Sequence, residues 1–356
     1  MQRNRVDIIS LGCYKNLVDS EKLMRMFKNA GFKVVHDPEV VRGEYVVVNT
    51  CGFIGDAKQE SIDVILELTE LKKRGKIGKI IVMGCLAERY LHQLEQEIPE
   101  VDAFYGKFNW TDMINDLIYQ KVEKKKIKNY RIITTPKHYA YLKIAEGCNR
   151  TCSYCAIPII TGAYKSLPME EIIEEAKWLA RKGVKELQLI AQDLTYYGLD
   201  LYRTHKLPEL VQRLSEIDGI EWIRLHYGYP NNFPYEILDV MKNNPKVCSY
   251  FDIALQHISD KMLVMMRRNI SKKETLAFIK KVRNSVSGIH FRTTLLVGHP
   301  GETEEDFNEL LEFVESQRFE RLGVFAYSHE EGTFAYLNYK DDIPEEVKQQ
   351  RVDKIM

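Results

Sequence analysis

Short apolar runs alternate with helical stretches along the chain, and this alternation limits the possible folds more than any other feature of the sequence. In the first third, strands are predicted at 6–12, 45–51 and 79–85, each followed by a segment with helical spacing. Asp19 is expected to cap the first of these helices. Strands that alternate with helices favour a parallel sheet covered on both faces. The sequence therefore predicts a doubly wound α/β domain over residues 1–120.

A second series of alternating segments follows. Its predicted strands are 139–146, 185–192, 221–228, 250–256, 290–297 and 321–327. The clearest helix is 169–182, because Pro168 begins it and Gly183 ends it. Six βα units are too few for an eight-stranded barrel, so residues 138–356 are predicted to form an open, partial (βα)6 barrel whose active face lies at the carboxyl ends of the strands. A lysine-rich run within 121–137 predicts a linker between the two domains.

Charge and hydropathy exclude two classes of protein. Lysine plus arginine and aspartate plus glutamate both number 51, so the net charge of zero argues against a protein held to nucleic acid mainly by charge. The chain contains no apolar run of the roughly 18 residues that a membrane span needs. Its first residues lack the apolar core of a signal peptide. A cytoplasmic protein without a membrane partner is expected, in which cysteines stay reduced.

The seven cysteines fall into groups by position. Cys13, Cys51 and Cys85 each lie at the carboxyl end of a predicted strand of the first domain. Those strand ends share one edge of a parallel sheet, where ligands bind, so the three thiols are expected to converge on a common ligand. Three separately buried thiols are the alternative, since cysteine is often buried.

Cys148, Cys152 and Cys155 form a C-x3-C-x2-C run directly after the first strand of the second domain. Structural zinc needs four ligands, and no fourth lies nearby. Iron–sulfur clusters are normally held by four cysteines, so three on a four-iron cluster leave one iron open for chemistry. Cys248, just before the fourth predicted strand and at the end opposite the active face, is interpreted as a structural thiol.

The C-x3-C-x2-C run resembles the signature of radical S-adenosylmethionine (SAM) enzymes. The resemblance implies a 4Fe–4S cluster whose open iron binds SAM. Gln192, Gly298, Gly301 and Glu302 follow strand ends of the same domain and are candidate SAM-pocket residues. A tight turn before the next helix explains the two glycines equally well. His257 also ends a strand, where a structural loop histidine is as consistent with the sequence as a catalytic one.

Taken together, two three-cysteine sets on these two domains resemble the radical-SAM methylthiotransferase family. Residues 10–21 (SLGCYKNLVDSE) and 49–54 (NTCGFI) are similar to its protein-modifying group. That resemblance implies methylthiolation of the β-carbon of an aspartate in ribosomal protein uS12, with two SAM molecules and two 4Fe–4S clusters. It assigns Cys13, Cys51 and Cys85 to the auxiliary cluster and Cys148, Cys152 and Cys155 to the radical-SAM cluster. It assigns no catalytic residue beyond these ligands.

The same resemblance implies further partners. The enzyme would need an electron donor such as flavodoxin or ferredoxin and a source of sulfur. Family members usually carry a C-terminal TRAM domain, which is expected to be absent from this chain. Two other functions remain open: the same chemistry on a transfer RNA adenosine next to the anticodon, and a non-catalytic iron–sulfur electron carrier. The residues around Cys13 and the zero net charge favour a protein substrate.

Overall fold

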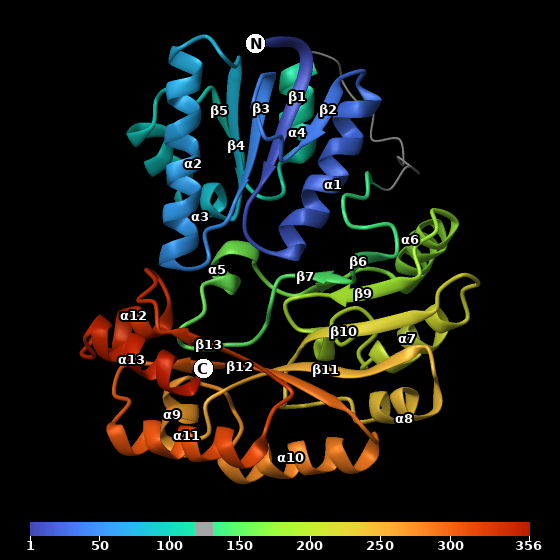
Figure 1. Cartoon of the computed structure of the whole chain (residues 1–356), viewed down its shortest axis with the longest axis vertical. Helices are drawn as coiled ribbons and strands as arrows, with labels where there is room; N and C mark the ends of the chain where they lie inside the picture. The colour runs from blue at the N-terminus through green and yellow to red at the C-terminus, as the bar shows by residue number, and fades with distance from the viewer. Residues whose placement is uncertain (119–130) are drawn as a thin grey trace. The chain divides into compact units, whose positions relative to one another are not determined.

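The computed structural model describes residues 1–118 and 131–356, which form two compact units (Figure 1). The first unit comprises Met1–Thr135 together with Ile159–Thr161, and the second comprises Pro136–Pro158 together with Gly162–Met356. The lysine run of the predicted linker, which is Lys121, Lys124, Lys125, Lys126 and Lys128, lies outside the described residues.

The first unit is built on a parallel sheet with strand order β2-β1-β3-β4-β5. Its strands are β1 (Gln2–Ser10), β2 (Lys33–His36), β3 (Gly43–Thr50), β4 (Lys79–Gly84) and β5 (Ala103–Phe104). Its helices are α1 (Tyr14–Asn29), α2 (Gly55–Lys73), α3 (Cys85–Glu97) and α4 (Trp110–Ile118). This arrangement confirms the doubly wound sheet. The chain order reverses between β1 and β3, which makes their carboxyl ends a topological switch point.

Apolar side chains on both faces of this sheet hold the helices in place. Val6 and Ile8 of β1 pack against Leu23 and Phe27 of α1 on one face. The other face buries residues of β3 and β4 against α2 and α3, and α1 and α2 accordingly lie on opposite sides of the sheet (Figure 1). The central residues of β3 (45–48) and β4 (80–83) are unbroken apolar runs, as expected for a parallel sheet buried on both faces.

The second unit contains a parallel sheet with strand order β13-β12-β11-β10-β9-β6. Its strands are β6 (Tyr139–Lys143), β9 (Glu186–Ile190), β10 (Trp222–Gly228), β11 (Val247–Gln256), β12 (His290–Val297) and β13 (Arg321–Ala326), and β7 (Ala145–Glu146) pairs with β8 (Lys165–Ser166). Because β6 and β13 stand at the two ends of the order, the sheet is open. This confirms the predicted parallel (βα)6 arrangement.

Helices follow the strands of the second unit in turn. They are α6 (Met169–Arg181), the short 3-10 helix η1 (Leu194–Tyr196), α7 (Leu207–Ser215), α8 (Glu236–Asn243), α9 (Asp260–Met265), α10 (Lys272–Ser285), α11 (Glu304–Gln317), α12 (Phe334–Asn338) and α13 (Glu345–Ile355). The short helix α5 (Ile157–Thr161) is divided between the units, because its last three residues belong to the first. The helix predicted from Pro168 and Gly183 is α6. No helix in the described parts of the chain is long and apolar enough to cross a membrane.

Two local predictions were wrong. The first helix begins at Tyr14, with Cys13 at its N-cap, so Asp19 lies inside α1 rather than at its start. Cys248 lies within β11, because that strand begins at Val247. It is still near the amino end of the strand, away from the carboxyl ends where the other second-unit cysteines lie.

Candidate active site

The three cysteines of the first unit follow the carboxyl ends of neighbouring strands. Asn49 of β3 pairs with Ser10 of β1, and Thr50 of β3 pairs with Gly84 of β4, so these strand ends are in register. Cys51 directly follows β3, and Cys85 is the first residue of α3. Cys13 caps α1 after a two-residue turn. The three thiols therefore gather at one edge of the sheet, as the sequence predicted.

Gly12 and Asn16 bring the three loops close together. Gly12 has a φ of +86°, and a Cβ atom there would lie 2.8 Å from the Cβ of Cys51, so only glycine allows this approach. The amide of Asn16 donates to the carbonyls of Leu11 (3.1 Å) and Thr50 (2.9 Å). Its Oδ1 accepts from the Cys85 thiol at 3.6 Å. Asn16 thus contacts all three cysteine-bearing loops.

The thiols of this set differ in proton affinity. Burial raises the pKa of Cys85 to about 12 and also raises that of Cys51. Desolvation opposes ionisation of Cys13 as well, yet its pKa is lowered because Lys15, backbone N–H groups and Lys107 favour the thiolate. Lys107, only 3% exposed, acts on all three thiols. The Lys107 ammonium also lies 3.7 Å from a buried carboxylate oxygen of Asp19, so the thiols lie beside a buried ion pair.

The three cysteines of the second unit lie in the loop between β7 and α5. Gly147 begins this loop with a φ of +74°, and a Cβ atom there would lie 2.1 Å from the carbonyl oxygen of Ala163. Burial raises the pKa of Cys148 to about 11 and raises that of Cys155 further. Negative charge on a neighbouring thiol of the loop adds to both rises in pKa. A metal must therefore displace protons when it binds here.

Neighbouring elements fix the backbone and side chains of this loop. The N–H of Arg150 donates to the sulfur of Cys148 at 3.4 Å, and the Arg150 guanidinium pairs with Asp193 at 2.8 Å. Ser153 donates its backbone N–H to the carbonyl of Met266 and pairs through its hydroxyl with His299. These contacts preorganise the three thiols before any ligand binds.

Both cysteine sets offer thiols, the donors that hold iron–sulfur clusters. Within residues 1–118 and 131–356, no three His, Cys, Asp or Glu side chains converge tightly enough to hold one ion. A four-iron cluster spreads its thiolates over separate iron atoms, so its ligands need not meet at one point. Soft thiolates also favour iron–sulfur chemistry over hard cations. The chemistry of the donor set in each unit fits such a cluster.

The four candidate SAM-pocket residues have different surroundings. Gln192 follows β9, and its Oε1 is buried without a hydrogen-bond partner among the described residues. An unsatisfied buried amide is costly, so this atom is suited to accept from a ligand. Gly301 has a φ of +78°, and a Cβ atom there would lie 2.9 Å from the Met265 methyl group.

Glu302 and Gly298 are engaged within the protein. The Glu302 carboxylate accepts from the Gly298 N–H (2.5 Å), from Arg351 (2.6 Å) and from His257 (3.1 Å). Gly298 also lies against the side chain of Lys348, which a Cβ atom would meet at 2.4 Å. These contacts support a turn that ties β12 to α13. A contact of Gly298, Gly301 or Glu302 with SAM stays a prediction.

His257 is fully buried and oriented by two contacts. The Ser259 N–H donates to its Nδ1 at 3.0 Å, so Nε2 carries the proton and donates to Glu302. Both ring nitrogens are therefore used inside the protein. This arrangement favours the structural interpretation of His257.

His299 should make the stability of the second unit depend on pH. Burial lowers the pKa of this imidazole from 6.5 to about 4. Between these values the unfolded chain binds a proton that the folded chain does not, so stability must fall as pH drops from about 6.5 to 4. We expect His299→Gln to flatten the decline of the urea midpoint across that window. Exposed His290→Gln is the control, and parallel profiles for His299→Gln and wild type would contradict the assignment.

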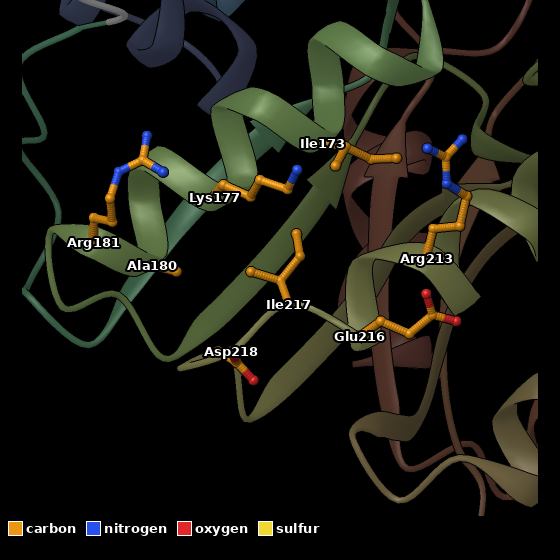
Figure 2. Close-up of a pocket in the computed structure, with 8 residues that line it drawn as sticks. All are labelled: Ile173, Lys177, Ala180, Arg181, Arg213, Glu216, Ile217 and Asp218. Carbon is orange, nitrogen blue, oxygen red and sulfur yellow. The ribbon is translucent and has the colours of Figure 1, made fainter.

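A surface groove elsewhere in the second unit does not coincide with these sites. It measures about 580 Å³ and is lined by Ile173, Lys177, Ala180, Arg181, Arg213, Glu216, Ile217 and Asp218 (Figure 2). These residues belong to α6, to the end of α7 and to the turn after it. Both helices end just before the next strand begins, so the groove lies toward the amino ends of β9 and β10. The cysteines lie at the opposite, carboxyl ends.

The fold and the cysteine loop of the second unit define a radical SAM enzyme. A family model described as the radical SAM superfamily matches residues 142–314, and one described as uncharacterized protein family UPF0004 matches residues 5–106. Curated relatives named ribosomal protein uS12 methylthiotransferase RimO align with all 356 residues of this chain. Each alignment covers 82% of the relative's own length. Those of Parabacteroides distasonis, Phocaeicola vulgatus and Porphyromonas gingivalis are 64%, 62% and 61% identical. The chain therefore belongs to the RimO family of methylthiotransferases, which use 4Fe–4S clusters and SAM.

Solved structures support the fold independently. The radical SAM methyltransferase TsrM from Kitasatospora setae matches with a TM-score of 0.63 and 14% identity, over 91% of this chain and 75% of that one. The cobalamin-dependent radical SAM enzyme OxsB matches with a TM-score of 0.60 and 12% identity, over 98% of this chain and 56% of that one. At such low identity these matches show the shared fold alone.

Some residues of the site were not assigned a role from the sequence. Asn16 was visible as part of a motif, but its contacts with three loops depend on the strand order. Lys107 gave no signal, because it follows the two-residue strand β5. Arg268 of the second unit lies 116 residues from the cysteine that it contacts.

Proposed function

We propose that this chain methylthiolates the β-carbon of an aspartate in ribosomal protein uS12. The observation that carries the proposal is the presence of two separate three-thiol sets, each preorganised at the carboxyl edge of its own parallel sheet. Relatives that match the whole chain are named for uS12 methylthiolation, which supports the choice of substrate. Membership in a family of enzymes disfavours the non-catalytic electron carrier.

Each cysteine set has its own task in this proposal. Cys148, Cys152 and Cys155 hold the radical-SAM cluster, and Gln192 Oε1 accepts a hydrogen bond from SAM. Cys13, Cys51 and Cys85 hold the auxiliary cluster, beside the buried ammonium of Lys107. When bound, the two clusters and two SAM molecules supply the electron, the 5′-deoxyadenosyl radical, the methyl group and the sulfur. Residues 1–120 form the auxiliary-cluster domain, 121–137 the linker and 138–356 the radical-SAM core.

Mass spectrometry of uS12 tests the substrate. The reconstituted enzyme is incubated anaerobically with uS12, SAM, sulfide and a reductant such as reduced flavodoxin. We expect a mass gain of one methylthio group, located on a single aspartate by fragmentation and absent when SAM is omitted. A parallel reaction with transfer RNA tests the alternative: a modified adenosine beside the anticodon together with unmodified uS12 would overturn the proposal.

A further inference from the structure

Arg268 lies against the cysteine loop of the second unit, although no sequence motif pointed to it. It follows α9 and is only 2% exposed. Its Nη1 donates to the sulfur of Cys152 at 3.2 Å and to the hydroxyl of Tyr154 at 3.3 Å. Its Nη2 donates to the carbonyl of Ala254 on β11. The guanidinium thus links one cluster cysteine to the central sheet.

Tyr229 packs against this guanidinium. The carbon of the Arg268 guanidinium lies 4.1 Å from the centroid of the Tyr229 ring, a cation–π distance. The Tyr229 hydroxyl donates to the backbone carbonyl of Arg268 at 2.8 Å, so ring and backbone hold each other. Arg150 lies 4.0 Å from the same centroid. The position of Arg268 is therefore built into the fold rather than adopted by a mobile surface side chain.

The charge of Arg268 is not neutralised by the protein. Arginine stays protonated in proteins, and a buried charge is costly unless it is paired. Among the residues that the structure describes, no carboxylate lies within ion-pair distance of Arg268, and its Nε is buried without a hydrogen-bond partner. Its neighbours are the thiol of Cys152, the phenols of Tyr154 and Tyr229 and the carbonyl of Ala254. Among these groups, the Cys152 thiol is the one that becomes negative when it binds a metal.

We propose that Arg268 is a positioning residue that donates to the sulfur of Cys152 in the loaded enzyme and stabilises the reduced radical-SAM cluster. This inference rests on the proposed assignment of Cys152 as a cluster ligand. A one-electron donor adds one negative charge to the cluster on reduction. A fixed cation that donates a hydrogen bond to a ligand sulfur favours the more negative state, and so raises the reduction potential.

A redox titration followed by electron paramagnetic resonance tests this role. The radical-SAM cluster is isolated in the full chain by replacing Cys13, Cys51 and Cys85 with alanine. At a given potential we expect Arg268→Gln to lower the ratio of reduced to oxidised cluster about tenfold. For one electron this corresponds to a fall of about 59 mV in the reduction potential. Arg268→Lys should lower it less, because lysine keeps the charge but loses the two-armed donor.

Arg267→Gln is the matched control. It removes the same charge one residue away, but Arg267 lies 4.4 Å from the ring of Phe334 and has a cation–π role there. The cluster of the Arg267→Gln variant should keep the reduction potential of the parent chain, which carries only the three alanine substitutions. A parent-like potential in Arg268→Gln overturns the proposal. If Arg268→Gln binds no iron, Arg268→Lys decides: a lowered potential supports the proposal, whereas a parent-like potential or no iron overturns it, because Arg268 is then purely structural.

The proposed function can fail separately. If the wild-type enzyme leaves uS12 unmodified while Arg268→Gln lowers the potential, the inference about Arg268 stands and the substrate assignment falls. If Cys152→Ala leaves the cluster and its potential unchanged, the ligand assignment is wrong and the inference falls with it.

Discussion

Replacing Cys148, Cys152 and Cys155 together with alanine is expected to abolish SAM cleavage and to halve the iron content. Two 4Fe–4S clusters amount to about eight irons per chain, and the variant should retain about four. The open iron that binds SAM is lost with the cluster, so 5′-deoxyadenosine formation should fall to background. Iron is counted after anaerobic reconstitution, and 5′-deoxyadenosine is measured by chromatography with a strong reductant present.

Cys248→Ala is the control for this variant. Cys248 is a half-buried thiol in β11, near the amino end of the strand, so its loss should leave the iron content and SAM cleavage unchanged. Circular dichroism checks that the triple variant is folded. An unchanged iron count in the folded triple variant would falsify the assignment of the three cysteines to a cluster.

The sequence allowed the central strands to be predicted because they are buried on both faces. The runs at 45–51 and 79–85 became β3 and β4, whose residues are largely inaccessible to solvent. The edge strands β2 and β5 were missed because they have four and two residues, too few to show a period. The start of α1 was misplaced for a different reason: Cys13 takes the N-cap without a side-chain hydrogen bond, and no usual capping residue marks that position.

The cysteine sets were predictable because a parallel sheet aligns all its carboxyl ends at one edge. That rule places Cys13, Cys51 and Cys85 together without knowledge of any side chain. The groups that set the charge around them follow no such rule. Lys107 lies in the loop after β5, and Arg268 lies just after the short helix α9. The burial of both side chains depends on tertiary packing. A local pattern cannot show such contacts, whereas a buried cation close to a thiol is evident in the structure.

Replacing Cys13, Cys51 and Cys85 together with alanine should separate the two halves of the chemistry. We expect uS12 methylthiolation to fall below detection, while 5′-deoxyadenosine is still formed and about four irons remain. The reason is structural, because the two cysteine sets follow strands of two different parallel sheets, in two compact units. The loss of thiols at the edge of the first sheet therefore leaves the loop that holds Cys148, Cys152 and Cys155 intact.

Comparison of the two triple variants makes this prediction specific. If both sets served one cluster, each variant would lose all iron and all SAM cleavage. Separate clusters instead predict that only the Cys148, Cys152 and Cys155 variant loses SAM cleavage, while both lose methylthiolation. Methylthiolated uS12 from the folded Cys13, Cys51 and Cys85 variant would contradict a role for the first set in supplying sulfur. Because Lys107 stays in place in that variant, a loss of product reports on the thiols themselves and not on the buried positive charge beside them.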